Sequence, residues 1–220
     1  MNALPPLYGD ARRWALVQAD ALELLSRFPD HSVDAVITDP PYGIGFNGQA
    51  WDGRDITATS TTGVAPGVAF EEWTHRWARE CRRVLVPGGY LVAFGATRTV
   101  HRLAAGIEDA GFEVRDQLAW LYGSGVPKTG LRDGRSSTLK PGYEPIVLAR
   151  APHRPNRRGS LSGDGLLGID EARIAEPGRP AGRWPANLLL GHHPRCTRRA
   201  CSRACVQLAF HHRKLAVPEH

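Results

Sequence analysis

Apolar residues along the first 150 positions fall into two kinds of pattern, short continuous runs and helically spaced stripes. Continuous runs, which are typical of buried strands, occupy residues 14–19, 33–38, 90–94, 112–121 and 144–149. Stripes with the spacing of an α-helix occupy residues 21–28, 70–86 and 100–107. Residues 43–69 show neither pattern and are rich in Gly, Thr, Ser and Ala, which indicates a long loop. Strands that alternate with helices predict an α/β fold with a doubly wound, mostly parallel sheet of about five strands.

The second part of the chain has weaker periodicity and a different charge. Residues 1–122 carry 11 Lys/Arg and 15 Asp/Glu, a net charge of −4, whereas residues 123–220 carry 17 Lys/Arg and 7 Asp/Glu, a net charge of +10. A basic region attached to an acidic one favours a polyanionic partner such as nucleic acid. We therefore expect an α/β core over residues 1–150, a basic region over 123–190 that overlaps its end, and a Cys/His/Arg-rich tail over 191–220. The tail has weak helix and strand patterns, so disorder is an open alternative there.

Composition excludes several classes of protein. Apolar residues make up 42% of the chain and charged residues 23%, which is close to globular averages and excludes wholesale disorder. No apolar run approaches the ~18 residues of a membrane helix, and the first residues lack a secretory apolar segment, so we expect a soluble, cytoplasmic protein. The four cysteines, of which three lie within residues 196–205, do not form the pattern of a disulfide framework.

The tetrapeptide Asp39-Pro40-Pro41-Tyr42 directly follows one of the apolar runs. Ligands of open α/β sheets bind outside the carboxyl ends of the strands, which is where this tetrapeptide is expected. Two consecutive prolines make a stiff turn without N–H donors, so its carbonyl groups can face a ligand. A carboxylate before the turn and an aromatic ring after it suit a flat heterocycle that carries an exocyclic amine. The alternative is a Pro-Pro turn with a capping aspartate and no chemical role.

An adenine N6 or cytosine N4 amine is a poor nucleophile because its lone pair is delocalised into the ring. Hydrogen bonds from both of its N–H groups, to the Asp39 carboxylate and the Pro40 carbonyl, would favour a pyramidal nitrogen with a free lone pair. Tyr42 would stack on the base once the base leaves the helix. The tetrapeptide therefore predicts a site for methylation of a base amine.

Five stretches in this order, residues 17–25, 33–43, 82–89, 123–128 and 140–145, resemble the DNA amino-methyltransferase family. The resemblance extends over roughly residues 14–195 and is greatest to the small, site-specific methylases of phages and prophages, which act in or beside restriction–modification systems. It implies the fold of S-adenosylmethionine-dependent methyltransferases, double-stranded DNA as partner and no need for a metal or a covalent intermediate. Adenine N6 is favoured over cytosine N4 because the motif begins with Asp.

The resemblance also assigns residues. Asp39, Pro40, Pro41 and Tyr42 match the catalytic motif, and Asp20 and Asp39 fall where relatives contact the cofactor. A capping role at the start of a helix is the alternative for Asp20. Residues 123–183 fall where the family keeps its target-recognition region, so basic side chains there are expected to contact DNA phosphates. The expected DNA contacts are Lys128, Arg132, Arg135 and Lys140, together with Trp51, which could instead lie against the edge of the sheet.

One departure from the family pattern concerns the cofactor. The glycine-rich loop that holds S-adenosylmethionine, expected after the recognition region, is not found in these 220 residues, and the fold is accordingly expected to be incomplete. The glycines at 43–48, 95 and 123–125 lack the strand-loop-helix context that such a loop requires. The alternatives are a truncated or degenerate methylase that only binds DNA, or one half of a split enzyme whose cofactor site a second chain or a homodimer completes.

Two further alternatives stay open. Relatives with an Asn-first motif methylate protein glutamine or RNA, but Asp39 and the basic second half of the chain argue against a protein substrate. Cys196, Cys201 and Cys205 lie among histidines and could bind zinc, although their spacing matches no common zinc motif and the arginines between them favour a solvated basic strip.

Overall fold

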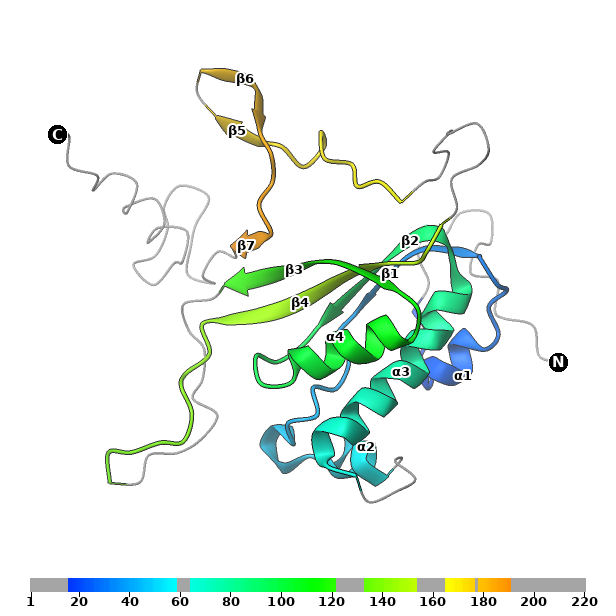
Figure 1. The fold of residues 1–220 in the computed structure, drawn as a ribbon, viewed down its shortest axis with the longest axis vertical. Helices are drawn as coiled ribbons and strands as arrows, with labels where there is room; N and C mark the ends of the chain where they lie inside the picture. Colours follow the sequence, from blue (N-terminus) through cyan, green and yellow to red (C-terminus); the bar gives the residue numbers. More distant parts are fainter. Residues whose placement is uncertain (1–15, 59–63, 122–132, 154–164, 177, 191–220) are drawn as a thin grey trace.

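The computed structural model describes residues 16–58, 64–121, 133–153, 165–176 and 178–190 (Figure 1). The helices are α1 (Ala21–Leu25), α2 (Arg54–Ala58), α3 (Pro66–Val84) and α4 (Val100–Asp109), with two 3₁₀ turns, η1 (Phe46–Gly48) and η2 (Ala50–Asp52). The strands are β1 (Val33–Thr38), β2 (Leu85–Phe94), β3 (Glu113–Leu121), β4 (Tyr143–Arg150), β5 (Ile174–Glu176), β6 (Arg179–Arg183) and β7 (Leu188–Leu190).

Five of the strands form one sheet in the order β1-β2-β4-β3-β7. β1 pairs parallel with β2, and β3 pairs parallel with β7, whereas β4 is antiparallel to both of its neighbours. Four strands therefore point the same way, with β4 reversed between them. The expected α/β fold with a mostly parallel sheet is confirmed, and the carboxyl ends of β1, β2 and β3 lie at one end of it.

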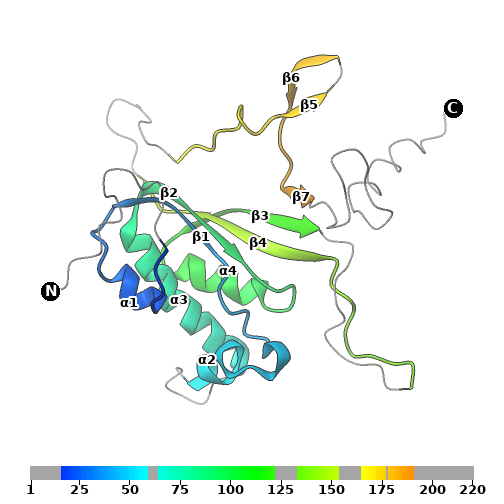
Figure 2. The same cartoon turned by 180° about the vertical axis from the view of Figure 1, so that it is seen from behind.

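The described helices form one layer. Helices α1, α2 and α4 all contact α3, and Figures 1 and 2 show this layer on one side of the sheet. The apolar stripe of α3 is buried against the sheet through Phe70, Trp77 and Cys81. The helix begins at Pro66, four residues before the stripe, because proline is favoured in the first turn, where its missing N–H is not needed. The sequence pattern therefore located this helix correctly but placed its start too late.

The close contact between α3 and α4 depends on Gly106. A Cβ atom at this position would lie 2.7 Å from the carbonyl oxygen of Glu71 and 2.8 Å from Cβ of Thr74, which is fully buried. Any side chain here would push the two helices apart. The absence of a side chain at Gly106 thus sets the spacing of the helical layer that supports the sheet.

We predict that Gly106→Ala lowers the free energy of unfolding by about 2 kcal/mol, because the new methyl group meets backbone that cannot move aside. Gly67→Ala is the matched control, since its Cβ would meet nothing nearer than 3.6 Å and alanine favours a helix. Thermal unfolding followed by circular dichroism measures both variants. Equal melting temperatures for the two would contradict the close contact.

The run at 14–19 was expected to be a buried strand, and this prediction is wrong for its described part. Residues 16–19 form no strand, and the Leu16 side chain is 91% exposed. An apolar run becomes a buried strand only when another element covers it, and none of the described residues covers this one. The fifth strand of the sheet is instead β7, which is too short to show any periodicity.

The segment expected to be one long loop, residues 43–69, contains local structure. It holds both 3₁₀ turns, α2 and the first turn of α3. These pieces are short, so their side chains show no helical stripe in the sequence. They matter because they shape the chain directly after the tetrapeptide.

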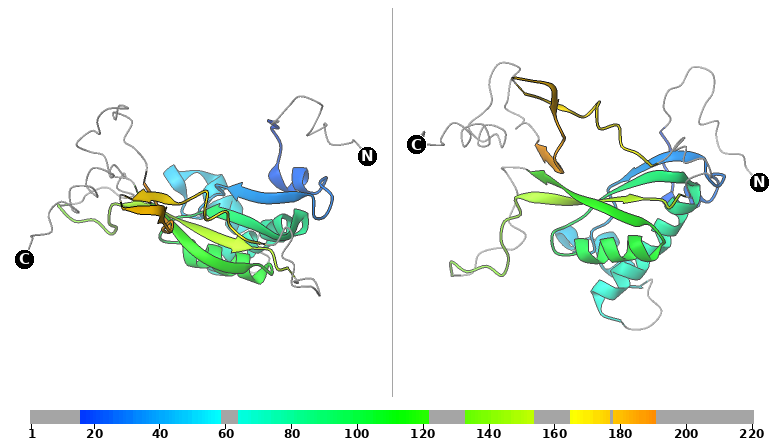
Figure 3. Two further views of the ribbon diagram at one scale, coloured as in Figure 1. Left: turned by 90° about the horizontal axis from the view of Figure 1, so that it is seen from above. Right: turned by 45° about the horizontal axis from the view of Figure 1, so that its top comes forward.

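The described residues beyond β4 contain three further strands. β5 and β6 form a separate antiparallel hairpin that stands away from the main sheet (Figure 3), and the Arg173 guanidinium lies 5.7 Å from the centre of the Trp184 ring. β7 follows the hairpin and returns the chain to the edge of the sheet beside β3. Among the residues that the structure describes, no helix combines the length and the apolar character needed to cross a membrane.

Candidate active site

The tetrapeptide Asp39–Tyr42 follows β1 at the carboxyl end of the sheet, as the sequence predicted. Asp39 is exposed and Pro40 is half-buried. Within the described part of the chain, neither the Asp39 carboxylate nor the Pro40 carbonyl accepts a hydrogen bond. Two adjacent acceptors are thus available to a donor from outside, which is the arrangement that an exocyclic amine requires.

Asp52 holds the loop that follows the tetrapeptide. Its side chain is 1% exposed, and one carboxylate oxygen, Oδ1, accepts hydrogen bonds from the backbone N–H groups of Tyr42 and Gly43. The other oxygen, Oδ2, accepts from the N–H groups of Ile44, at 3.3 Å, and Phe46, at 2.7 Å. A buried carboxylate is costly unless it is hydrogen-bonded, and here four donors satisfy it. Asp52 therefore fixes the backbone from Tyr42 onward.

The sequence analysis missed Asp52, although one signal was present. Successive backbone N–H groups can converge on an anion when left-handed residues interrupt the chain, and glycine is the usual residue at such positions. Gly43 and Gly45 have φ values of +68° and +65° in this structure. A lone aspartate shortly after a Gly-x-Gly segment was therefore a candidate for this role.

Two side chains before α4 hold the same loop from the other side. The Thr99 hydroxyl donates a hydrogen bond of 2.7 Å to the Tyr42 carbonyl, and the Arg98 guanidinium donates one of 3.2 Å to the Ile44 carbonyl. Gly43 lies so close to the Phe70 ring that a Cβ atom would be 2.6 Å from it. The loop is thus fixed by the turns that follow β1 and β2 and by the first part of α3.

Asp20 has a structural role in the described residues. Its Oδ1 accepts hydrogen bonds from the N–H groups of Leu22, at 2.9 Å, and Glu23, at 3.0 Å, which makes it the N-cap of α1. This is the capping alternative that the sequence left open. A contact between Asp20 and the cofactor stays a prediction.

Three of the five predicted DNA-contact residues lie within the described part of the chain. Trp51 is 52% exposed, and Arg135 and Lys140 are exposed on the segment that leads into β4. Because β4 runs against β2 and β3, this segment lies at the carboxyl end of those strands, and Figure 1 shows it extending away from the sheet. Lys128 and Arg132 lie outside the described residues. The placed candidates are therefore at the same end of the sheet as Asp39.

The structure does not describe the cysteines that the sequence offered as possible zinc ligands. Cys196, Cys201 and Cys205 lie outside the described residues, within which no group of three or more possible metal ligands occurs. Cys81 is buried in the core, and its burial raises the pKa of the thiol to about 12. Its thiol is therefore neutral at physiological pH and contributes to packing.

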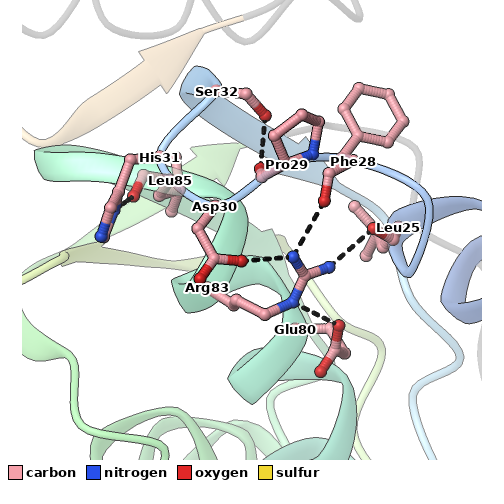
Figure 4. Close-up of polar contacts among 9 residues, drawn as sticks. All are labelled: Leu25, Phe28, Pro29, Asp30, His31, Ser32, Glu80, Arg83 and Leu85. Carbon is pink, nitrogen blue, oxygen red and sulfur yellow. Dashed lines mark hydrogen bonds and ion pairs between the residues drawn. The ribbon is translucent and has the colours of Figure 1, made fainter.

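The opposite end of β1 is fastened by Arg83. Its guanidinium donates hydrogen bonds to the carboxylates of Asp30 and Glu80 and to the carbonyl oxygens of Leu25 and Phe28 (Figure 4). The bond to Asp30, followed by that to Glu80, raises the pKa of Arg83, which stays charged. The side chain thereby joins α3 to the connection between α1 and β1.

We predict that Arg83→Ala lowers the free energy of unfolding by about 2 kcal/mol, because two backbone carbonyls and two carboxylates lose a charged donor. Arg83→Lys is expected to recover less than half of this loss, since an ammonium group cannot reproduce the fork geometry. Urea denaturation measures both, with Arg79→Ala as the control at an exposed arginine of the same helix. An effect of Arg83→Ala no larger than the control would contradict the proposed fastening.

Comparisons with known proteins found a matching family model and related sequences. A family model described as DNA methylase, of the N6/N4 type, matches residues 33–176, a range that includes β1, the tetrapeptide and Asp52. The type II methyltransferase M2.LlaDCHI of Lactococcus lactis subsp. cremoris is 27% identical over 153 residues, and M2.DpnII of Streptococcus pneumoniae is 25% identical over 146 residues. These matches cover 68% and 65% of this chain but 55% and 53% of the relatives, so the chain spans about half of their length.

One solved structure supports the fold. The PvuII DNA methyltransferase, described as cytosine-N4-specific, superposes with a TM-score of 0.56 at 17% sequence identity. The superposition covers 82% of this chain and 58% of that protein. At this level of identity the similarity shows a shared fold.

Proposed function

The chain belongs to the DNA methylase family whose model matches its residues 33–176, and from this premise we propose that it transfers a methyl group to an exocyclic amine of a base in double-stranded DNA. The observation that carries the proposal is the pair of acceptors at Asp39 and Pro40, to which no described residue donates a hydrogen bond, beside a loop that Asp52 holds in place. S-adenosylmethionine is the methyl donor that the family implies.

Each functional residue of the tetrapeptide has a separate role in binding or activating the base. A base that has left the helix would donate one amine N–H to the Asp39 carboxylate and the other to the Pro40 carbonyl, which would free the nitrogen lone pair for attack on the methyl group. The methyl–sulfur bond of S-adenosylmethionine would break as the nitrogen–methyl bond forms, and the methylated amine would release one proton. Tyr42 stacks on the base, and the hydrogen bonds of its backbone to Asp52 and Thr99 keep it beside the acceptors. Because the amine itself attacks, no covalent bond forms between enzyme and base.

We propose adenine N6 as the target in preference to cytosine N4. Support comes from the motif, which begins with Asp. The similarity to a cytosine-N4-specific enzyme does not weigh against it, because that similarity extends to the fold and not to the base.

The described residues do not by themselves form an enclosed cofactor site. Asp39 is exposed, the carboxylate of Asp20 caps α1, and the 220 residues lack the family's glycine-rich loop. Strand β1 is an edge of the sheet, and the Ile37 side chain on it is 74% exposed. Apolar edges of mostly parallel sheets are normally covered. We therefore propose that a second chain, or a second copy of this one, covers β1 and completes the cofactor site.

The proposal can be tested by producing the chain in a bacterial host without DNA methylation of its own and analysing the nucleosides of the host DNA. N6-methyladenine is the expected product, and N4-methylcytosine would reverse the choice of base. Calorimetric titration of S-adenosylmethionine into the purified chain, with and without DNA, gives the second result. No methylated base and no cofactor binding, with DNA binding intact, would replace the proposal by the alternative of a DNA-binding half.

A further inference from the structure

The loop between Gly45 and Asp52 presents two aromatic side chains to the outside. Phe46 is 55% exposed and Trp51 is 52% exposed, and they stand at the two ends of the six-residue segment 46–51. The N–H of Gly45 donates a hydrogen bond of 2.9 Å to the Asp52 carbonyl, which closes the segment into a loop. Two large aromatic side chains are thus exposed to solvent on one closed loop.

The loop is held in one conformation by its own backbone. The N–H groups of Gly48 and Gln49 donate to the carbonyls of Gly45 and Phe46, each at 2.9 Å, and the Phe46 N–H donates to Asp52 Oδ2. The same Asp52 carboxylate accepts from the N–H of Tyr42. One side chain therefore fixes the aromatic loop relative to the tetrapeptide.

The chemistry of the loop favours a base over a phosphate. Residues 43–51 include no charged side chain, although the chain as a whole carries 28 Lys/Arg. A surface that contacts phosphates uses Lys and Arg, whereas aromatic rings stack on the face of any base. An uncharged loop with exposed aromatic rings therefore fits an unstacked nucleobase.

We propose that Phe46 and Trp51 form a stacking surface for a nucleobase next to the one held at Asp39. The inference rests on the proposed function, because it takes DNA as the substrate, and it adds a second base contact to that of Tyr42. The stacking surface holds the strand while the target base is out of the helix. It requires unpaired bases, and its two aromatic rings carry no charge that would attract a phosphate.

The test compares the affinity for a single-stranded oligonucleotide of about 12 nucleotides with that for the duplex of the same sequence, by fluorescence anisotropy. Phe46→Ala and Trp51→Ala are each expected to weaken single-strand binding about tenfold and duplex binding less than about twofold, with an unchanged salt dependence. Lys140→Ala should instead weaken both and lower the salt dependence. Leu139→Ala removes a 91% exposed apolar side chain at the same end of the sheet and should change neither.

Conservative variants separate stacking from folding. Phe46→Tyr and Trp51→Phe keep an aromatic face and should retain single-strand affinity, whereas Phe46→Leu keeps the bulk and should lose it. Equal losses on single strand and duplex, or full affinity in Phe46→Leu, would overturn the stacking surface while leaving the proposed function intact. If the unaltered chain binds neither nucleic acid, both proposals fail together.

Discussion

Asp39→Ala is expected to lower the rate of methyl transfer about a thousandfold while leaving DNA affinity within about twofold. In the proposed mechanism the carboxylate is one of two acceptors for the base amine, and its loss would leave the nitrogen lone pair delocalised into the ring. The fold should not suffer, because Asp39 is exposed and its carboxylate accepts no hydrogen bond within the described residues. Single-turnover transfer of labelled methyl groups to DNA, with the cofactor saturating, measures the effect.

Two further variants sharpen this experiment. Asp39→Asn keeps one acceptor oxygen without the charge, so an intermediate rate is expected. Asp34→Ala removes another exposed carboxylate from the same segment, five residues earlier, and should transfer methyl groups at the original rate. Methylation that persists unchanged in Asp39→Ala would eliminate the proposed activation of the amine.

The sequence pattern correctly predicted the helices and strands in which buried residues recur at a regular spacing. The apolar run of β1 was located with its bounds at Val33 and Thr38, and the stripes of α3 and α4 were located because one face of each helix is buried along its length. The tetrapeptide Asp39–Tyr42 was identified as a candidate site for a similar reason. Its four residues are consecutive, so their chemistry can be read without knowledge of the fold.

Features that depend on distant partners could not be read in this way. The run at 14–19 has the composition of a strand, but burial depends on a neighbour, and Leu16 has none among the described residues. β3 and β4 are antiparallel neighbours, and the sequence between them shows no helical stripe of the kind that a parallel crossover needs. Absence of a helical pattern between two strands was thus a better guide to their direction than the alternation of the whole chain.

Asp20 and Asp52 show that local sequence patterns reveal roles within an element but not contacts with a distant loop. Asp20 has the position of a helix cap in the sequence, and a helix cap is what the structure contains. Asp52 contacts backbone N–H groups six to ten residues earlier, and no periodic pattern marks such a contact. A residue whose role is to satisfy main-chain groups of a loop becomes visible only once the loop has a shape.

Asp52→Ala is expected to lower the free energy of unfolding by about 3 kcal/mol, because four backbone N–H groups lose a charged acceptor at a buried position. Among molecules that remain folded, methyl transfer should fall about a hundredfold, since Tyr42 and the Pro40 carbonyl no longer keep their separation. Asp52→Asn retains one acceptor oxygen, which can serve only two of the four donors. It is therefore expected to lie between Asp52→Ala and the unaltered chain in both measurements.

Hydrogen exchange separates positioning from general destabilisation. Below the melting temperature of Asp52→Ala, exchange should accelerate at residues 42–46 while the amides of β2 and α3 keep their protection. The loss of rate should appear in kcat more than in KM for duplex DNA, because the aromatic side chains of the loop that Asp52 holds are expected to change duplex affinity less than about twofold. Asp55→Ala, at an exposed carboxylate of α2, is the matched control and should leave exchange and rate unchanged. Faster exchange spread evenly over the sheet, with kcat reduced only in proportion to the unfolded fraction, would show that Asp52 stabilises the fold without positioning the catalytic residues.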